Sequence, residues 1–219
     1  MNDTTEHAPT ANRVVLTGIR WETYEAILRD HEDRSAPRFT YDTGLLEIMS
    51  PLRFHERTNR LAARLVEEVL EAWGRDYDNI GSLTLKMPSM EKGVEPDTCF
   101  YIAHVGALNE RETADLEQGD PPPDLVIEID DHSLSVARLP IYAAFGVPEI
   151  WRIRRKTIEI LLLLNGAYAV AETSANLPPL TPDILSSLLQ KSETMTRGDW
   201  ADAVTDWAKT NVPETETGA

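Results

Sequence analysis

The chain has 219 residues, of which 42% are hydrophobic, and its 21 basic and 37 acidic residues give a formal net charge of −16 at pH 7. This length is enough for one sizeable hydrophobic core and short for two, and no apolar run approaches the roughly 18 residues of a membrane span. The polar residues 1–13 lack the pattern of a secretory signal, and the single cysteine excludes an intramolecular disulfide, so we expect one cytoplasmic domain.

We expect this domain to occupy residues 14–210, between polar, disordered tails at 1–13 and 211–219. Apolar residues at helical spacing predict an amphipathic helix at residues 19–29 that caps the core. Two short apolar runs within residues 39–49 flank the turn sequence Asp-Thr-Gly, which predicts a β-hairpin. The N-terminal part of the domain is therefore expected to contribute one helix and one hairpin.

A long amphipathic helix is predicted for residues 52–73, with Gly74 ending it. One or two strands are expected within residues 77–87, where apolar and polar residues alternate. After a turn, residues 94–102 are rich in β-branched and aromatic side chains and predict one continuous strand.

An acidic connection at residues 103–123 leads to a second central strand at 124–130, whose apolar run predicts burial on both faces. The triplet Asp-His-Ser at residues 131–133 invites a catalytic-triad interpretation, which we reject because three adjacent residues rarely converge. A helix follows at residues 133–145, and the short basic run at 152–156 is interpreted as a solvated turn. The remaining predicted elements are a hairpin at 149–154 and 157–164, a strand at 166–170, and helices at 181–190 and 198–209.

Two acidic residues are unusual because they occupy predicted strands, in which aspartate is depleted. Asp97 lies in the first of the two central strands, and Glu128 lies in the second. A charge that is partly buried needs a partner, and carboxylate oxygens are the ligands that Mg²⁺ prefers. We therefore predict that a divalent cation is the shared partner of both side chains.

The motifs around these acids resemble the Uma-type bacterial family of putative endonucleases, part of the PD-(D/E)xK restriction-endonuclease-like superfamily. The resemblance covers roughly residues 17–190. It rests on Met49-Ser50-Pro51 followed by His55, on Glu95-Pro96-Asp97, on residues 123–128, on residues 138–142, and on residues 146–151.

The resemblance implies an α/β (α+β) fold with a restriction-endonuclease-like core, in which helices flank a central mixed sheet. It also implies a putative endonuclease that needs Mg²⁺ (or Mn²⁺) to hydrolyse phosphodiester bonds in DNA, and a homodimer. The implied catalytic residues are Asp97, Glu128 and Arg138, the implied metal ligands are Asp97, Glu128 and the backbone carbonyl of Ile129, and the possible accessory residues are Glu56, His55 and Asp130.

One position departs from the superfamily pattern. The lysine that normally follows the second acid by two residues is replaced by Asp130. In the resembled family a helix supplies the lysine instead, and here that position holds Arg138. Arginine can stabilise negative charge, but its pKa is too high for a general base at neutral pH. Lys86 or Lys92 would substitute only if the fold brings one of them close.

Three hypotheses remain open. The first is the metal-dependent DNA hydrolase, and the second is a catalytically impaired binding module that keeps the fold. The second is favoured by Arg138 and by the net charge of −16, which opposes binding to a polyanion. The third takes Asp97 and Glu128 as the acid and nucleophile of a glycosidase. An edge strand, or the helix carrying Trp200 and Trp207, would form the homodimer contact.

Overall fold

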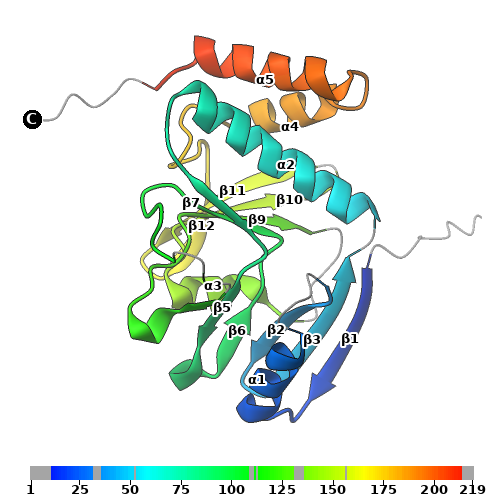
Figure 1. Ribbon diagram of the computed structural model, residues 1–219, viewed down its shortest axis with the longest axis vertical. Helices are drawn as coiled ribbons and strands as arrows, with labels where there is room; N and C mark the ends of the chain where they lie inside the picture. The colour runs from blue at the N-terminus through cyan, green and yellow to red at the C-terminus, as the bar shows by residue number, and fades with distance from the viewer. Residues whose placement is uncertain are drawn as a thin grey trace, which may run out of the picture.

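The computed structural model describes residues 11–31, 36–51, 53–108, 111, 113–130, 136–155 and 157–213, and the described strands form two six-stranded sheets (Figure 1). The first sheet has the order β1-β3-β2-β6-β5-β8, and the second has the order β12-β11-β10-β9-β7-β4. Strands of the first sheet are β1 (Ala11–Thr17), β2 (Arg38–Asp42), β3 (Leu45–Pro51), β5 (Thr84–Met87), β6 (Lys92–Val94) and β8 (Thr113–Asp115). Strands of the second sheet are β4 (Asp78–Gly81), β7 (Thr98–Tyr101), β9 (Leu125–Ile129), β10 (Glu149–Ile153), β11 (Ile158–Leu164) and β12 (Ala167–Ala171).

Helices cover both sheets. In Figure 1 the long helix α2 lies with α4 and α5 over one face of the second sheet, while α3 lies on its other face, toward the first sheet. Helix α1 packs on the first sheet, against β2 and β3. The helices are α1 (Trp21–Asp30), α2 (Arg53–Ala72), α3 (Arg138–Phe145), α4 (Pro182–Lys191) and α5 (Arg197–Thr210), with short 3₁₀ helices at Pro88–Met90 and Leu116–Gln118. None of the described helices is long and apolar enough to cross a membrane.

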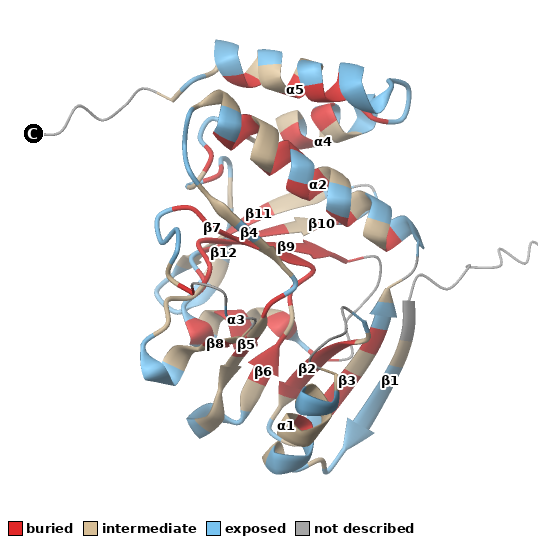
Figure 2. Ribbon diagram, viewed as in Figure 1, coloured by how far each residue is buried: buried red, intermediate tan, exposed pale blue. Residues whose placement is uncertain are grey.

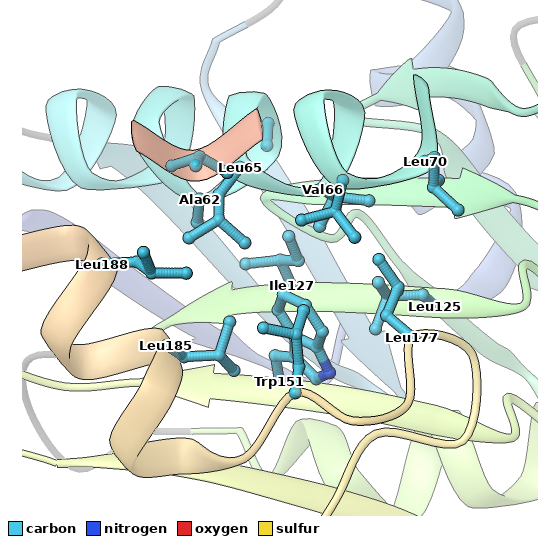
Figure 3. Close-up of a cluster of buried hydrophobic side chains, with 14 of the residues drawn as sticks. Ala62, Leu65, Val66, Leu70, Leu125, Ile127, Trp151, Leu177, Leu185 and Leu188 are labelled. Atoms are coloured by element: carbon cyan, nitrogen blue, oxygen red, sulfur yellow. The ribbon is translucent and has the colours of Figure 1, made fainter. Parts of the chain in front are cut away.

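The largest core lies between α2, α4 and the second sheet. Leu65 and Val66 of α2 are fully buried and face Ile127 of β9, and Trp151 of β10 packs beside Leu185 of α4 (Figure 3). Figure 2 shows that the buried face of α2 points to the sheet while its outer face is exposed. This arrangement follows from the apolar spacing of α2, because residues three and four apart share one helix face. It fixes α2 against the C-terminal half of the chain.

Most predicted elements are confirmed, including the hairpin of β2 and β3, the long helix, and the strand β9 buried on both faces. The continuous strand predicted at 94–102 is wrong. Strand β6 ends at Val94 in the first sheet, and β7 starts at Thr98 in the second, so residues 95–97 cross from one sheet to the other. A second sheet was not predicted, and the expected tail at 1–13 overlaps β1, which begins at Ala11.

The Trp200 side chain is used within the chain. It is buried against α2, and its indole nitrogen donates a hydrogen bond of 2.7 Å to the carbonyl of Leu188. This tryptophan is therefore not itself an exposed contact for a partner subunit. The homodimer itself remains a prediction.

Gly93 of β6 is required because its backbone passes directly over Tyr24. A Cβ at this position would lie 2.7 Å from two ring carbons of Tyr24, which is fully buried and stacked on Tyr41 with centroids 4.9 Å apart. We expect Gly93→Ala to lower the free energy of unfolding by about 1–3 kcal/mol, because a tightly packed ring must move. Urea unfolding measures this loss.

Gly198 of α5 provides the control, because a Cβ there meets no atom within 4 Å. Gly198→Ala should leave the protein as stable or gain up to about 1 kcal/mol from helix propensity. Equal stability of the two variants would contradict the close approach at Gly93.

Candidate active site

Asp97 lies where the chain crosses from the first sheet to the second. Its side chain is only 1% exposed, and its Oδ2 accepts a hydrogen bond of 2.7 Å from the backbone N–H of Ile129 on β9. Thr98 pairs with Ile127 in the antiparallel β7–β9 ladder, so one further step along the ladder brings Asp97 beside Glu128. The sheet pairing therefore places both predicted acids together.

Three side chains from other elements hold Asp97, two at its carboxylate and one at its backbone carbonyl. Arg38 of β2 donates through Nη1 to Oδ1 of Asp97 and through Nη2 to Glu56, at 3.1 Å. His55 of α2 places its Nε2 3.1 Å from Oδ2 of Asp97. Asn59, one turn further along α2, donates to the backbone carbonyl of Asp97 at 3.0 Å. The carboxylate is thus held by the first sheet and by the start of α2.

Glu128 is held by helix α3, which begins directly at Arg138. The Nη1 of Arg138 donates to Oε2 of Glu128 at 2.8 Å, and the hydroxyl of Tyr142 donates to Oε1. Both partners lie on the same face of α3 because they are four residues apart. The guanidinium of Arg138 is buried, and its Nη2 also lies 3.6 Å from Oε1 of Glu47 on β3.

Glu47 is a third buried carboxylate at this place. It has no exposed surface, and neither of its carboxylate oxygens has a hydrogen-bond partner among the described residues. An ionised group in that state is costly unless further positive charge compensates it. The buried carboxylates of Glu47, Asp97 and Glu128 therefore outnumber the two buried guanidinium groups of Arg38 and Arg138.

The environment shifts the pKa values of the two predicted acids in opposite directions. Burial alone would raise the pKa of Asp97, but the hydrogen bond from His55 and the charge of Arg38 outweigh it and lower the pKa. Burial raises the pKa of Glu128, which the charge of Arg138 offsets only in part, and the nearby Asp97 raises it further. The surroundings therefore favour the ionised form of Asp97, whereas they disfavour ionisation of Glu128 relative to a free glutamate.

The carboxylates of Asp97 and Glu128 are suitable ligands for a hard divalent cation. No group of three or more His, Cys, Asp or Glu side chains in the described part of the chain is arranged to hold a metal ion. Mg²⁺ does not need such a group, since it usually keeps several waters and takes one or two carboxylates from the protein. Asp97 and Glu128 supply two such carboxylates, and the unpartnered oxygens of Glu47 show that negative charge remains in excess. The residues present therefore fit the predicted ion.

We call the buried group of Asp97, Glu128, Glu47, Arg38 and Arg138 the acidic cluster. Some of the other predicted site residues contact this cluster, and others lie outside it. His55 and Glu56 join the cluster, as described above, but Asp130 does not contribute to it. The Oδ2 of Asp130 instead pairs with Arg154 at 3.1 Å. Lys86 and Lys92 are also elsewhere, because Lys86 pairs with Glu25 of α1 and Lys92 pairs with Asp42 of β2. The rejected triad at 131–133 lies outside the described residues.

Sequence reasoning missed Arg38, Glu47, Asn59 and Tyr142. A signal existed for Asn59, which lies four residues after His55, and for Tyr142, which lies four residues after Arg138, because such spacing marks one helix face. No comparable signal marked Arg38 or Glu47. Both belong to a hairpin whose place beside the second sheet depends on the tertiary fold.

The opposed pKa shifts predict different stability effects for isosteric substitutions in metal-free buffer. Because the folded state lowers the pKa of Asp97, its ionisation contributes stability above the unfolded pKa, and that stability is lost as the pH falls through the folded pKa. Glu128 has a raised folded pKa, so its contribution is present at low pH and is lost as the pH rises. We expect Asp97→Asn to cost more stability at pH 7 than Glu128→Gln.

Urea unfolding of both variants at pH 7 and at acidic pH tests this order. The cost of Asp97→Asn should shrink as the pH falls, whereas that of Glu128→Gln should not. A larger loss for Glu128→Gln at pH 7 would show that the environments of the two acids are assigned the wrong way round.

Comparison with known proteins agrees with this geometry. A family model described as Uma2, putative restriction endonuclease, matches residues 21–192. The structure is similar to the crystal structure of a putative nuclease belonging to DUF820 from Anabaena variabilis ATCC 29413, with a TM-score of 0.51 and 15% sequence identity over 78% of this chain and 99% of that one. A search of the curated proteins found no match. The predicted α/β class with a restriction-endonuclease-like core is confirmed.

Proposed function

Because the chain belongs to the Uma2 family of putative restriction endonucleases, we propose that it is a metal-dependent endonuclease that hydrolyses phosphodiester bonds in DNA. One observation carries the proposal. Asp97 and Glu128 come from distant parts of the chain and meet in a buried site, beside a third carboxylate, Glu47, whose oxygens have no hydrogen-bond partner among the described residues. Glu47 lies 3.6 Å from Arg138, which already pairs with Glu128, so three buried carboxylates share two buried guanidinium groups.

Asp97 and Glu128 would hold Mg²⁺ (or Mn²⁺), with the backbone carbonyl of Ile129 as a third ligand. When bound, such a cation polarises the phosphate and lowers the pKa of a bound water. Arg138 supplies positive charge beside Glu128, and Arg38 does so beside Asp97, where negative charge develops on the phosphate. Their bonds to the carboxylates keep both guanidinium groups oriented before substrate arrives.

In this proposal His55 would accept the proton. Its Nε2 faces the carboxylate of Asp97 at 3.1 Å, which favours a proton on that nitrogen and leaves Nδ1 as an acceptor. Nδ1 is buried and has no hydrogen-bond partner among the described residues. Arg138 cannot take this role because its pKa is raised even above the usual arginine value, through the charges of Glu128 and its neighbours.

A second candidate is a binding module that keeps the fold without hydrolysis. This candidate is supported by the ion pairs of the two predicted metal ligands. Asp97 already pairs with Arg38, and Glu128 already pairs with Arg138. Tyr142 occupies the remaining oxygen of Glu128. In this candidate the arginines replace the metal, and the cluster serves stability.

A plasmid-nicking assay separates the two candidates. The natural chain should nick supercoiled DNA with Mg²⁺ or Mn²⁺ and should lose this activity with EDTA. Glu128→Gln should abolish nicking, whereas Arg138→Lys should retain it, because lysine keeps the positive charge. No nicking by the natural chain with either metal would support the binding module.

A further inference from the structure

A groove runs between the N-terminal halves of α2 and α5 and has a volume of about 610 Å³. The two helices are parallel neighbours (Figure 1), since Thr205 donates to Glu68 at 2.8 Å and the indole of Trp73 donates to the carbonyl of Ala208 at 2.9 Å. Both helices therefore present their N-terminal ends, the positive ends of their dipoles, at the same side of the groove.

Arginine dominates the rim of this groove. The exposed arginines that line it are Arg53, Arg57, Arg60, Arg64 and Arg197. The four on α2 follow a single helical stripe, and Glu56 is the one acid among the lining residues. Arg64 pairs with Glu68, whereas no ion pair within the described residues involves Arg53, Arg57 or Arg197. A chain with a net charge of −16 thus concentrates positive charge on one surface.

Most of the charges on α2 are arranged against the helix dipole, with Glu56 in the first turn as an exception. Helices are stabilised by acids near the N-terminus and bases near the C-terminus. In α2, Arg53, Arg57 and Arg60 lie in the first half together with Glu56, and Glu67, Glu68 and Glu71 lie in the second half together with Arg64. Arg197 starts α5, which also carries Asp199 in its first turn and Lys209 in its last turn. The arginines of the groove therefore lie mainly near the positive ends of the two helix dipoles, where a bound anion would be stabilised.

The groove is linked to the candidate active site through Glu56. Glu56 lines it and accepts a hydrogen bond of 3.1 Å from Arg38, which also binds Asp97. A smaller hollow of about 160 Å³ lies on the other side of α2, and its lining includes Ile129, Arg154 and Arg155. Arg57 and Leu61 line both this hollow and the groove. A polyanion bound along the start of α2 would therefore lie close to Glu56 and to Arg38, which contacts Asp97.

We propose that the groove between α2 and α5 binds the sugar-phosphate backbone of duplex DNA and guides one phosphate toward Asp97 and Glu128. The choice of DNA rests on the proposed function, whereas the anionic character of the ligand rests on the arginines alone. The stripe from Arg53 to Arg64 spans about 16 Å of helix, which matches roughly five base-pair steps of one strand.

The test measures binding of a fluorescent duplex of about 20 base pairs by anisotropy, in EDTA, over about 50 to 200 mM salt. The groove variant is Arg57→Ala with Arg197→Ala, which removes one charge from each helix. The control is Arg20→Ala with Arg29→Ala, exposed arginines on and beside α1, away from the groove, that change the net charge equally. Alanine suits helices, so both variants should fold.

The groove variant should bind at least about tenfold more weakly, and its slope of log K against log salt should be shallower by about 2, while the control stays close to the natural chain. Unchanged binding and slope in the groove variant, or an equal loss in the control, would overturn the proposal. Preferential binding of duplex RNA, or no duplex-DNA binding at the lowest salt, would overturn it as well.

The same preparations separate this inference from the proposed function. If the groove variant loses binding and the natural chain does not nick DNA in Mg²⁺, the groove is supported as the DNA-binding site and hydrolysis is rejected. If the natural chain nicks DNA and the groove variant binds it fully, hydrolysis is supported and the groove is rejected as the binding site.

Discussion

Asp97→Asn should lower the rate of metal-dependent plasmid nicking by roughly a thousandfold, because the change removes a charged ligand from the reacting site. The asparagine carbonyl can still accept the hydrogen bond that Ile129 donates to Asp97, so the local backbone should persist. What is lost is the negative charge that faces Arg38 and would face the cation. Initial rates of nicking, with thermal melting to confirm folding, measure the effect.

Asp130→Asn is the matched control for this variant. Asp130 is also a buried aspartate paired with an arginine, but its partner is Arg154, outside the cluster. Its nicking rate should stay within a few-fold of the natural rate. Comparable nicking by Asp97→Asn and the natural chain would remove Asp97 from the active site.

Arg138→Met should lower the free energy of unfolding by about 3–5 kcal/mol at pH 7, because it leaves buried carboxylates without their cation. Arg138 is 2% exposed and serves both Glu128 and Glu47. The pKa of Glu128 is already raised by burial, and it should rise further without the guanidinium. A protonated Glu128 needs no cation, so the loss should shrink as the pH falls toward 5 and grow as the pH rises. Urea unfolding across this range measures it.

Two controls define the cause of that loss. Adding Glu128→Gln to Arg138→Met should recover part of the stability at pH 7, because the buried charge is removed. Arg152→Met breaks a partly exposed pair with Glu159 and should cost no more than about 1 kcal/mol. A loss for Arg138→Met that does not depend on pH would point to packing rather than to unpaired charge.

The sequence predicted local elements well because their signals are local. The hairpin of β2 and β3 has its glycine at a positive φ of 94°, at Gly44, and the buried stripe of α2 follows from helical spacing. The split of the predicted strand at 94–102 had no such signal. Val94 and Thr98 are both strand-like, and only pairing with distant strands assigns them to different sheets.

The same distinction explains what was missed in the site. Asp97 and Glu128 were found because acids in apolar strands are rare, and Arg138 was found through the family resemblance. Arg38 and Glu47 lie on neighbouring strands of the first sheet, where a charged residue is ordinary in sequence. Their burial arises only when that sheet packs beside the second one and α3 brings Arg138 between them. Position in sequence does not encode that contact.

The central claim is that one hard cation binds between the carboxylates of Asp97 and Glu128. Calorimetric titration of the metal-free protein with Mn²⁺ tests it most directly, with Asp97→Asn and Glu128→Gln as variants and Asp130→Asn as control. The natural chain and the control should bind one ion per chain, and the other two variants should lose that binding. Absence of binding by the natural chain, or equal binding by all four proteins, would contradict the claim.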